Sequence, residues 1–309
     1  MNRPTRRRHK PRIFTSPPST LDMNLGSDLA EISEKAGRPL DTWQHVVLEK
    51  SSRMDTLAED GTNPFLAGWT WSASEVGLLT GAQNGRTFVA EARALGGLLT
   101  LRDQVVYTLP SRQTAVLHFR SFCDVLESSA ELATQVQGIH YRENLIVMRN
   151  GGSIRFCPRR SVTIDAAIDA DLLVIDDAHD APDEWARAAV HGTPFRKPQS
   201  PRRQVWYVGT AVHQDRHPNG RVFTAVRNRG LTGTDPSLCW IEYSVPDRRD
   251  ENGDLEQDLT KPSVIARANP SPRIDFDRIA SARKMLLPEV FESEICGIGT
   301  WPNLDPVTV

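Results

Sequence analysis

Two adjacent carboxylates, Asp176 and Asp177, follow directly on a short apolar run at residues 172–175. Such a run is typical of a buried parallel strand. Acidic side chains at the carboxyl end of this strand would lie where open α/β sheets bind ligands. In proteins that hydrolyse nucleoside triphosphates, one acid there organises Mg²⁺ and another orients the attacking water. The pair therefore predicts hydrolysis with Asp176 at the metal and Asp177 at the water, provided that the chain also supplies a phosphate-binding loop.

The acidic pair has simpler interpretations. Carboxylates are favoured at the start of a helix, so the two residues could cap the segment that follows. Further acids stand nearby at positions 169, 171, 180 and 183, and a two-metal nuclease site is conceivable. No second strand ends in acids at a spacing that would complete such a site. Helix capping and solvation explain these four acids better.

Residues 80–87, with the sequence TGAQNGRT, separate an expected strand from an expected helix. A phosphate-binding loop has the pattern G-x-x-x-x-G-K-[ST], in which backbone N–H groups wrap the phosphates and the hydroxyl ligates Mg²⁺. Gly85 and Thr87 fit this pattern. Thr80 takes the place of the first glycine, and Arg86 takes the place of the lysine. A glycine turn alone is more often only a turn, but the acidic strand downstream supports the functional interpretation.

Gly209 and Thr210 end another apolar run, at residues 205–208. A small hydroxyl residue at this strand tip could sense the outermost phosphate and link it to movement. The alternative is an ordinary tight turn. Four cysteines lie far apart without a C-x-x-C pair, which favours free thiols over zinc.

Apolar runs alternate with stretches of helical periodicity through the middle of the chain. This order predicts an α/β fold with a mostly parallel sheet and helices on both faces. The expected strands are 75–80, 104–108, 145–148, 153–157, 172–175, 205–208 and 238–244, and the expected helices are 87–99, 114–127, 183–190, 220–229 and 276–287.

The 309 residues carry a formal net charge of −2, but the ends differ from the middle. Residues 1–12 hold six Lys or Arg and no acid. We expect residues 1–36 to form a basic, disordered arm, which either touches nucleic-acid phosphates or is only a solvated tail. Residues 37–245 would form the nucleotide-binding domain, and residues 246–309 a linker with a small helical piece. No apolar stretch reaches the roughly 20 residues that span a bilayer, so no membrane partner is expected.

Several segments together resemble the ATPase half of the large terminase subunit of tailed phages, over residues 38–302. They are PLDTWQHVVL, EVGLLTGAQNGRTFVAEARAL as Walker A, DLLVIDDAHD as Walker B, QVWYVGTAV, RHPNGRVFTAVRNRGL, DPSLCWIEYSV, ANPSPRI and GIGTWP. The resemblance implies a RecA-like P-loop fold and a motor that uses ATP and Mg²⁺. Such a motor moves double-stranded DNA through a portal protein into a procapsid. It implies a homo-oligomeric ring, a small terminase subunit as partner, and work in the host bacterial cytoplasm, transiently at the portal.

The resemblance also implies roles for individual residues. Gln44 would contact adenine, and Asp176 and Thr87 would hold Mg²⁺. Asp177 would act in hydrolysis together with Arg86, and Gly209 and Thr210 would couple hydrolysis to movement. The nucleotide would lie against Gly81, Gln83, Asn84, Gly85, Arg86 and Thr87.

Four departures from the family pattern lower the expected activity. Ala82 stands where an arginine is frequent, Arg86 where lysine is usual, and Asp177 where glutamate is usual. Asp is shorter by one methylene, and a misplacement of about 1 Å can cost about 10²-fold in rate. The Gly/Arg-rich segment reads PRRS at 158–161, which leaves a trans-acting arginine unassigned.

The chain ends where family members begin their nuclease domain, so we expect no nuclease activity unless a separate polypeptide supplies it. Two other functions stay open. One is a terminase-like nucleotide- or DNA-binding subunit that hydrolyses ATP poorly or not at all. The other is a helicase-like ATPase, suggested by the DDAH sequence at 176–179. That class needs two such domains, and this chain supplies one.

Overall fold

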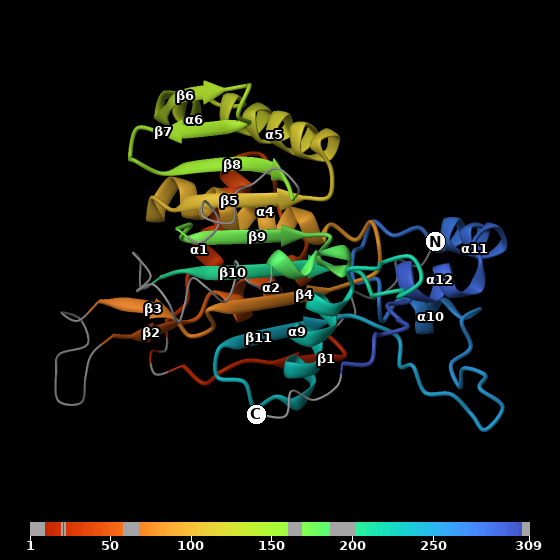
Figure 1. Ribbon diagram of the computed structural model, residues 1–309. Helices are drawn as coiled ribbons and strands as arrows, with labels where there is room; N and C mark the ends of the chain where they lie inside the picture. Colours follow the sequence, from red (N-terminus) through yellow and green to blue (C-terminus); the bar gives the residue numbers. More distant parts are fainter. Residues whose placement is uncertain are drawn as a thin grey trace, which may run out of the picture.

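A nine-stranded sheet forms the centre of the computed structural model, which describes residues 10–19, 21, 23–57, 68–159, 169–185 and 202–304 (Figure 1). The strand order is β1-β11-β4-β10-β9-β5-β8-β7-β6. The six strands from β11 to β8 are parallel, whereas β1, β7 and β6 run antiparallel to their neighbours. The strands are β1 (Ile13–Thr15), β4 (Glu75–Leu79), β5 (Gln104–Leu109), β6 (Val136–His140), β7 (Leu145–Met148), β8 (Ser153–Pro158), β9 (Leu172–Asp176), β10 (Gln204–Gly209) and β11 (Leu238–Glu242), with β2 (Met54–Thr56) and β3 (Trp69–Trp71) in a separate pair.

Helices cover both faces of the sheet, which confirms the predicted fold class. One face packs against α1 (Gly26–Lys35), α2 (Thr42–Ser51), α4 (Arg86–Gly96) and α5 (Arg112–Glu127). The other face packs against the short turn η2 (Ala178–Asp180) and α9 (Arg221–Thr232). The remaining helices are η1 (Gly97–Leu101), α6 (Ala130–Gln135), α10 (Pro262–Ile265), α11 (Phe276–Met285) and α12 (Pro288–Glu294). The helix expected over 183–190 is described only as far as Trp185, and its remainder lies outside the described residues.

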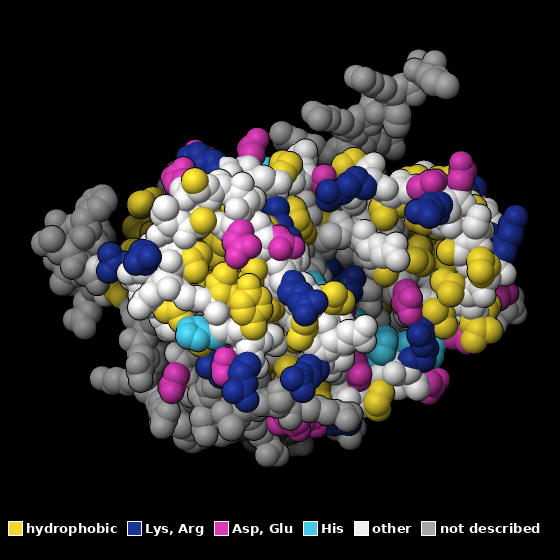
Figure 2. Space-filling model, turned by 90° about the horizontal axis from the view of Figure 1, so that it is seen from above, with side chains coloured by type: hydrophobic (Ala, Val, Ile, Leu, Met, Phe, Trp, Pro, Cys, Tyr) yellow, Lys and Arg dark blue, Asp and Glu magenta, His cyan; other side chains and the backbone are white. Residues whose placement is uncertain are grey.

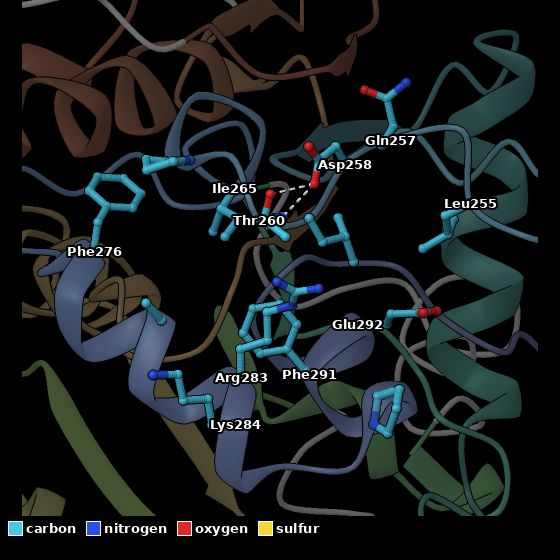
Figure 3. A pocket seen from close by; sticks show the side chains of 14 residues that line it. Leu255, Gln257, Asp258, Thr260, Ile265, Phe276, Arg283, Lys284, Phe291 and Glu292 are labelled. Atoms are coloured by element: carbon cyan, nitrogen blue, oxygen red, sulfur yellow. Dashed lines mark hydrogen bonds between the residues drawn. The ribbon is translucent and has the colours of Figure 1, made fainter.

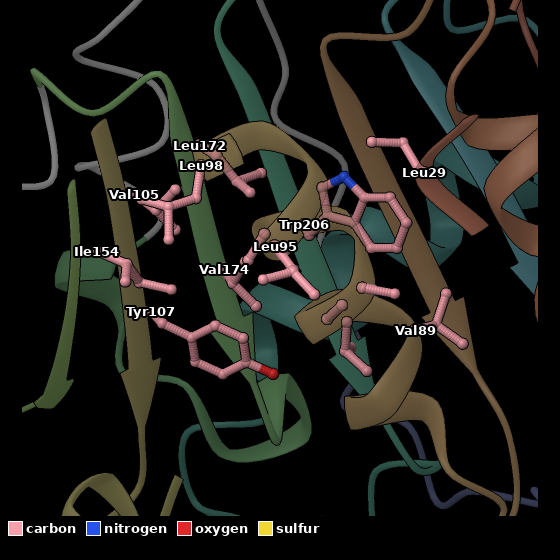
Figure 4. Packing of buried hydrophobic residues seen from close by; sticks show 14 of the residues in the cluster. Leu29, Val89, Leu95, Leu98, Val105, Tyr107, Ile154, Leu172, Val174 and Trp206 are labelled. Atoms are coloured by element: carbon pink, nitrogen blue, oxygen red, sulfur yellow. The ribbon is translucent and has the colours of Figure 1, made fainter. Parts of the chain in front are cut away.

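The face under α4 shows why the central strands are apolar throughout. Tyr107 of β5, Val174 of β9 and Trp206 of β10 meet Val89 and Leu95 of α4 (Figure 4). All five side chains are buried. The next residue along each of these strands faces the opposite layer, which is also covered. A parallel strand buried on both faces therefore reads as a continuous apolar run, the pattern used to predict it.

The amino-terminal segment is ordered where it is described, so the prediction of a disordered arm over 1–36 is wrong for that part. β1 extends the sheet antiparallel to β11, and the guanidinium of Arg12 pairs with the buried carboxylate of Glu242. Leu29 and Ala30 of α1 are buried in the core. Tertiary contacts thus fix a segment whose own composition is basic and rich in proline. Residues 1–9 of the predicted arm lie outside the described residues.

The carboxyl-terminal region lies beside the carboxyl ends of the parallel strands (Figure 1). Its small helices surround a separate apolar cluster that includes Val245, Ile265 and Phe291. A cavity of about 690 Å³ opens within this region, between side chains such as Phe276 and Arg283 (Figure 3). None of the predicted site residues lines this cavity. Within the described ranges, no helix is both long enough and apolar enough to cross a bilayer.

Candidate active site

The predicted phosphate loop lies between β4 and α4, as expected. Gly85 has a φ of +92°, and Gln83 has a φ of +60°. A Cβ atom at position 85 would lie 2.9 Å from the side-chain nitrogen of Gln44, so glycine is required there for both reasons. α4 begins at Arg86. The first N–H groups of a helix have no partner within it, and together with the helix dipole they bind anions. The loop and the start of α4 can therefore receive phosphate.

Asn84 joins this loop to the carboxyl-terminal region. Its buried amide nitrogen donates to the carbonyls of Gly81 and Ala82, at 3.0 and 3.2 Å, and to the side-chain oxygen of Asn269 at 2.8 Å. Its oxygen accepts from the backbone N–H of Ser271. The N–H of Gly81 donates to the carbonyl of Ala268 at 2.9 Å. These bonds shape the loop, while nucleotide contact by Gly81 and Asn84 stays a prediction.

Gln44 lies at the start of α2, with its side chain against the phosphate loop. Its amide nitrogen donates to the carbonyl of Gly85 at 2.9 Å, and its oxygen accepts from the N–H of Asp41 at 2.7 Å. The side chain is fully buried. The structure thus brings Gln44 to the phosphate loop, and both polar groups of its side chain form hydrogen bonds within the protein. Its predicted contact with adenine is untested and stays a prediction.

Asp176 is the buried member of the acidic pair. Its carboxylate accepts from the hydroxyl of Tyr107 at 3.0 Å and from the N–H of Asp177 at 2.9 Å. Burial, and then the charge of Asp177, raise the pKa of Asp176, although Arg86 and a hydrogen bond with Thr87 act in the opposite direction. A divalent cation at this position would offset the cost of burying the carboxylate. The oxygen atoms of Asp176 and Thr87 are ligands of the kind that Mg²⁺ prefers.

Asp177 faces the phosphate loop from a strained backbone. Its φ is +51°, in the left-handed region that few non-glycine residues adopt. One carboxylate oxygen lies 2.8 Å from a guanidinium nitrogen of Arg86. Burial alone would raise the pKa of Asp177, but the charge and hydrogen bond of Arg86, together with the charge of Arg159, outweigh it, so the pKa is lowered. The two predicted catalytic residues therefore meet in space, and Asp177 stays ionised.

Arg159 holds this strained turn and was not predicted to do so. Its buried guanidinium donates to the backbone carbonyls of Asp176, Asp177 and Asp180, at 3.1 and 3.2 Å for Asp177. The sequence signal is an arginine directly after an expected strand, in the PRRS segment that leaves a trans-acting arginine unassigned. Its neighbours at 160 and 161 lie outside the described residues.

Thr210 lies beside the acidic pair because β10 is the neighbour of β9 in the sheet. Its backbone N–H donates to Nδ1 of His179 at 3.3 Å, and its hydroxyl lies 3.3 Å from the same atom. Burial lowers the pKa of His179 to about 3, so the ring is neutral and Nδ1 can accept. The structure thus brings the predicted coupling residue to the acidic turn, through a histidine that sequence reasoning treated only as part of a helicase-like motif.

A second charged network supports the site from the α5 side. His118 of α5 pairs with Glu91 of α4 at 2.8 Å, and Arg38 pairs with the same carboxylate. Burial lowers the pKa of His118, but the hydrogen bond and charge of Glu91 outweigh it and raise the pKa above 6.5. The His118 ring also stacks on Tyr107, the donor to Asp176.

This network predicts a pH dependence of stability. A raised pKa in the folded state means that protonated His118 stabilises the fold fully below about pH 6.5, and that this contribution is lost as the pH rises through the folded pKa. The free energy of unfolding, measured by urea denaturation, should therefore fall across this window in the wild type. The fall should be smaller in His118→Gln. Equal pH dependence in both proteins would contradict a raised pKa of His118 in the folded state.

No protein family model matches the sequence, and no curated protein matches it. Solved structures do match. The large terminase of bacteriophage HK97 superimposes with a TM-score of 0.67 at 16% identity, over 89% of this chain and 55% of that one. A mutant of the large terminase ATPase domain from Thermus phage P74-26 gives a TM-score of 0.56 at 13% identity, over 87% of this chain and 98% of that one.

This chain has the fold of a large-terminase ATPase domain. It spans about half the length of the HK97 protein and nearly the whole of the P74-26 domain. In this terminase ATPase fold, the phosphate loop, the acidic pair and Thr210 follow β4, β9 and β10, which are neighbouring parallel strands. Their carboxyl ends share one edge of the sheet, the position where α/β folds bind ligands.

Proposed function

We propose that this chain is the ATP-hydrolysing motor domain of a phage terminase and drives double-stranded DNA into a procapsid. The contact between Arg86 and Asp177 carries the proposal. These residues belong to separate motifs, yet a guanidinium nitrogen lies 2.8 Å from a carboxylate oxygen. Thr87 and Asp176 lie beside them and share a hydrogen bond. The residues that we propose for phosphate binding, for Mg²⁺ and for catalysis therefore lie in one place.

Each group has a role in hydrolysis. The loop amides and Arg86 would bind the phosphates of ATP, and Thr87 with Asp176 would hold Mg²⁺. The metal would supply positive charge at the phosphates. Ionised Asp177 would orient the attacking water and accept its proton. Arg159 keeps the Asp177 turn in place through backbone carbonyls, and Thr210 lies where it could respond to the outermost phosphate.

The same contact favours a second candidate, a nucleotide-binding subunit with little hydrolysis. While Arg86 pairs with Asp177, the cation that would bind phosphate and the carboxylate that would orient water are bound to each other. ATP must draw Arg86 away before either can act. Arginine is larger than lysine and forms a stronger, planar contact with a carboxylate, so this release costs more than it would for lysine. We therefore expect slow turnover.

The proposed partners follow from the packaging role. They are double-stranded DNA, a portal protein, a small terminase subunit and further copies of this chain in a ring. The site of action would be the host bacterial cytoplasm, at the procapsid portal. On the face shown in Figure 2, basic side chains are interspersed with acidic and apolar ones.

ATP turnover by the purified chain, with and without linear double-stranded DNA, tests the proposal. Arg86→Ala should lower turnover by about 10²-fold or more, because it removes the cation at the phosphates. Arg86→Lys should raise turnover above wild type, because lysine reaches the phosphates and releases Asp177 more readily. Phosphate release measures both.

Arg120→Ala is the matched control, since Arg120 is exposed on α5. It should leave turnover unchanged. Turnover at the wild-type rate in Arg86→Ala would exclude this site as the place of ATP hydrolysis. Nucleotide binding without turnover in wild type, even with DNA, would favour the binding subunit.

A further inference from the structure

The acidic turn (residues 177–180) and the coupling loop (residues 210–220) are bonded to each other at two points. Nδ1 of His179 accepts from the backbone N–H of Thr210 at 3.3 Å. A carboxylate oxygen of Asp180 accepts from both the backbone and the side-chain N–H groups of Asn219, each at 3.2 Å. The turn therefore holds the coupling loop near its beginning and near its end.

The His179 ring is closely surrounded at this contact. A Cβ atom at Gly209 would lie 3.2 Å from Nδ1 of His179 and 3.1 Å from the ring of Phe223, so a side chain at 209 would push the histidine away. The ring also packs on His217 of the coupling loop, with centroids 4.5 Å apart. His217 in turn accepts from the N–H of His213 at 3.0 Å. His179 and the coupling loop thus fix each other's position.

The coupling loop continues this connection to the carboxyl-terminal region. The N–H of Gln214 donates to the hydroxyl of Thr300 at 3.0 Å, and Arg216 pairs with Glu294 at 2.7 Å. The backbone carbonyl of Glu294 accepts from the N–H of Ala82 in the phosphate loop, at 2.6 Å. A continuous set of contacts therefore runs from Asp177 through the coupling loop and the carboxyl-terminal helices back to the nucleotide loop.

We infer that His179 is a positioning residue that transmits the state of Asp177 to the coupling loop, and through Arg216 to the carboxyl-terminal helices. Only one residue, Ala178, separates Asp177 from His179, and η2 is a single turn. When Arg86 leaves the Asp177 carboxylate for phosphate, a change that reaches the Asp177 backbone must therefore move the imidazole. Its acceptor then pulls or releases Thr210. This inference rests on the proposed ATPase function.

Two substitutions of His179 distinguish the role of its hydrogen-bond acceptor from that of its volume. His179→Asn keeps an acceptor oxygen near the position of Nδ1, whereas His179→Leu keeps a similar volume without an acceptor. DNA-stimulated ATP turnover should fall by about tenfold in His179→Leu and stay within about threefold of wild type in His179→Asn. The affinity for a fluorescent ATP analogue should be unchanged in both, because the side-chain hydrogen bonds found for His179 among the described residues go to Thr210 and not to the phosphate loop. Loss in both variants, or in neither, would overturn the role of the acceptor.

Hydrogen exchange of residues 210–220, with and without a non-hydrolysable ATP analogue, gives a second readout. Nucleotide should change the exchange of this loop in wild type and His179→Asn but not in His179→Leu. Asn219→Ala, at a half-exposed position, keeps the test usable if His179→Leu does not fold, and should weaken the same response. If nucleotide changes the hydrogen exchange of this loop in Asn219→Ala and His179→Leu as it does in wild type, the inference about His179 is overturned and the proposed function is not. A wild-type chain that binds no ATP analogue would overturn the proposed function, and this inference with it.

Discussion

Asp177→Asn is expected to abolish ATP hydrolysis, with a fall in kcat of about 10²- to 10⁴-fold, because an amide cannot accept the proton of the attacking water. The substitution preserves the size of the side chain. It also weakens the 2.8 Å ion pair that holds Arg86. Arg86 is then freer to bind phosphate, so the affinity for ATP should rise while turnover disappears. Phosphate release and titration with a fluorescent ATP analogue measure the two effects.

Opposite changes in binding and turnover distinguish this role from simple unfolding. Asp183→Asn, at an exposed acid a few residues further on, should change neither quantity. Asp177→Glu should raise turnover, since the longer side chain reaches further toward the phosphates. An Asp177→Asn protein that hydrolyses ATP as fast as wild type would rule out Asp177 as the catalytic carboxylate.

The parallel centre of the fold could be predicted from local sequence. Its strands are buried on both faces, so each is a short apolar run, and several end in glycine or acid at the ligand-binding edge. Asn150–Gly151, between two expected strands, is a dipeptide typical of a tight hairpin turn, and it joins the antiparallel strands β7 and β8 with a φ of +96° at Gly151. These features depend on residues close together in the chain.

The edges of the sheet depend on distant partners and were missed. β1 is a three-residue strand in a basic segment, and its position is fixed by pairing with β11 and by the contact of Arg12 with Glu242. β6 contains a bulge where it pairs with β7, and each of its residues is half-buried or exposed. Neither segment has the continuous apolar run of a central strand.

The candidate site also has a part that local sequence predicts and a part that depends on distant contacts. Arg86, Thr87, Asp176 and Asp177 could be brought together from sequence, because residues that follow neighbouring parallel strands meet at one edge. The contacts of Arg159 and His179 could not. Both depend on the left-handed backbone of Asp177, which turns the following carbonyls and the imidazole toward partners far along the chain.

Asn84→Ala is expected to lower stability and nucleotide affinity together. The side chain is buried and serves three acceptors and one donor, which belong to Gly81, Ala82, Asn269 and Ser271. Each buried polar group left without a partner costs about 1–3 kcal/mol. We expect a loss of about 3 kcal/mol or more in the free energy of unfolding, measured by urea denaturation. The affinity for an ATP analogue should fall at least about tenfold, a change of about 1.4 kcal/mol.

Asn269→Ala tests the same link from the other side. It removes the acceptor of the 2.8 Å bond from Asn84 but leaves the bonds of Asn84 to Gly81 and Ala82 in place. If the carboxyl-terminal region holds the phosphate loop in its binding shape, Asn269→Ala must also weaken nucleotide binding. The double variant should then lose less than the sum of the two single losses, with a coupling of about 0.5–3 kcal/mol. Asn252→Ala, at an exposed turn, should be neutral. Strictly additive losses would mean that the Asn84–Asn269 contact does not hold the phosphate loop in its binding shape.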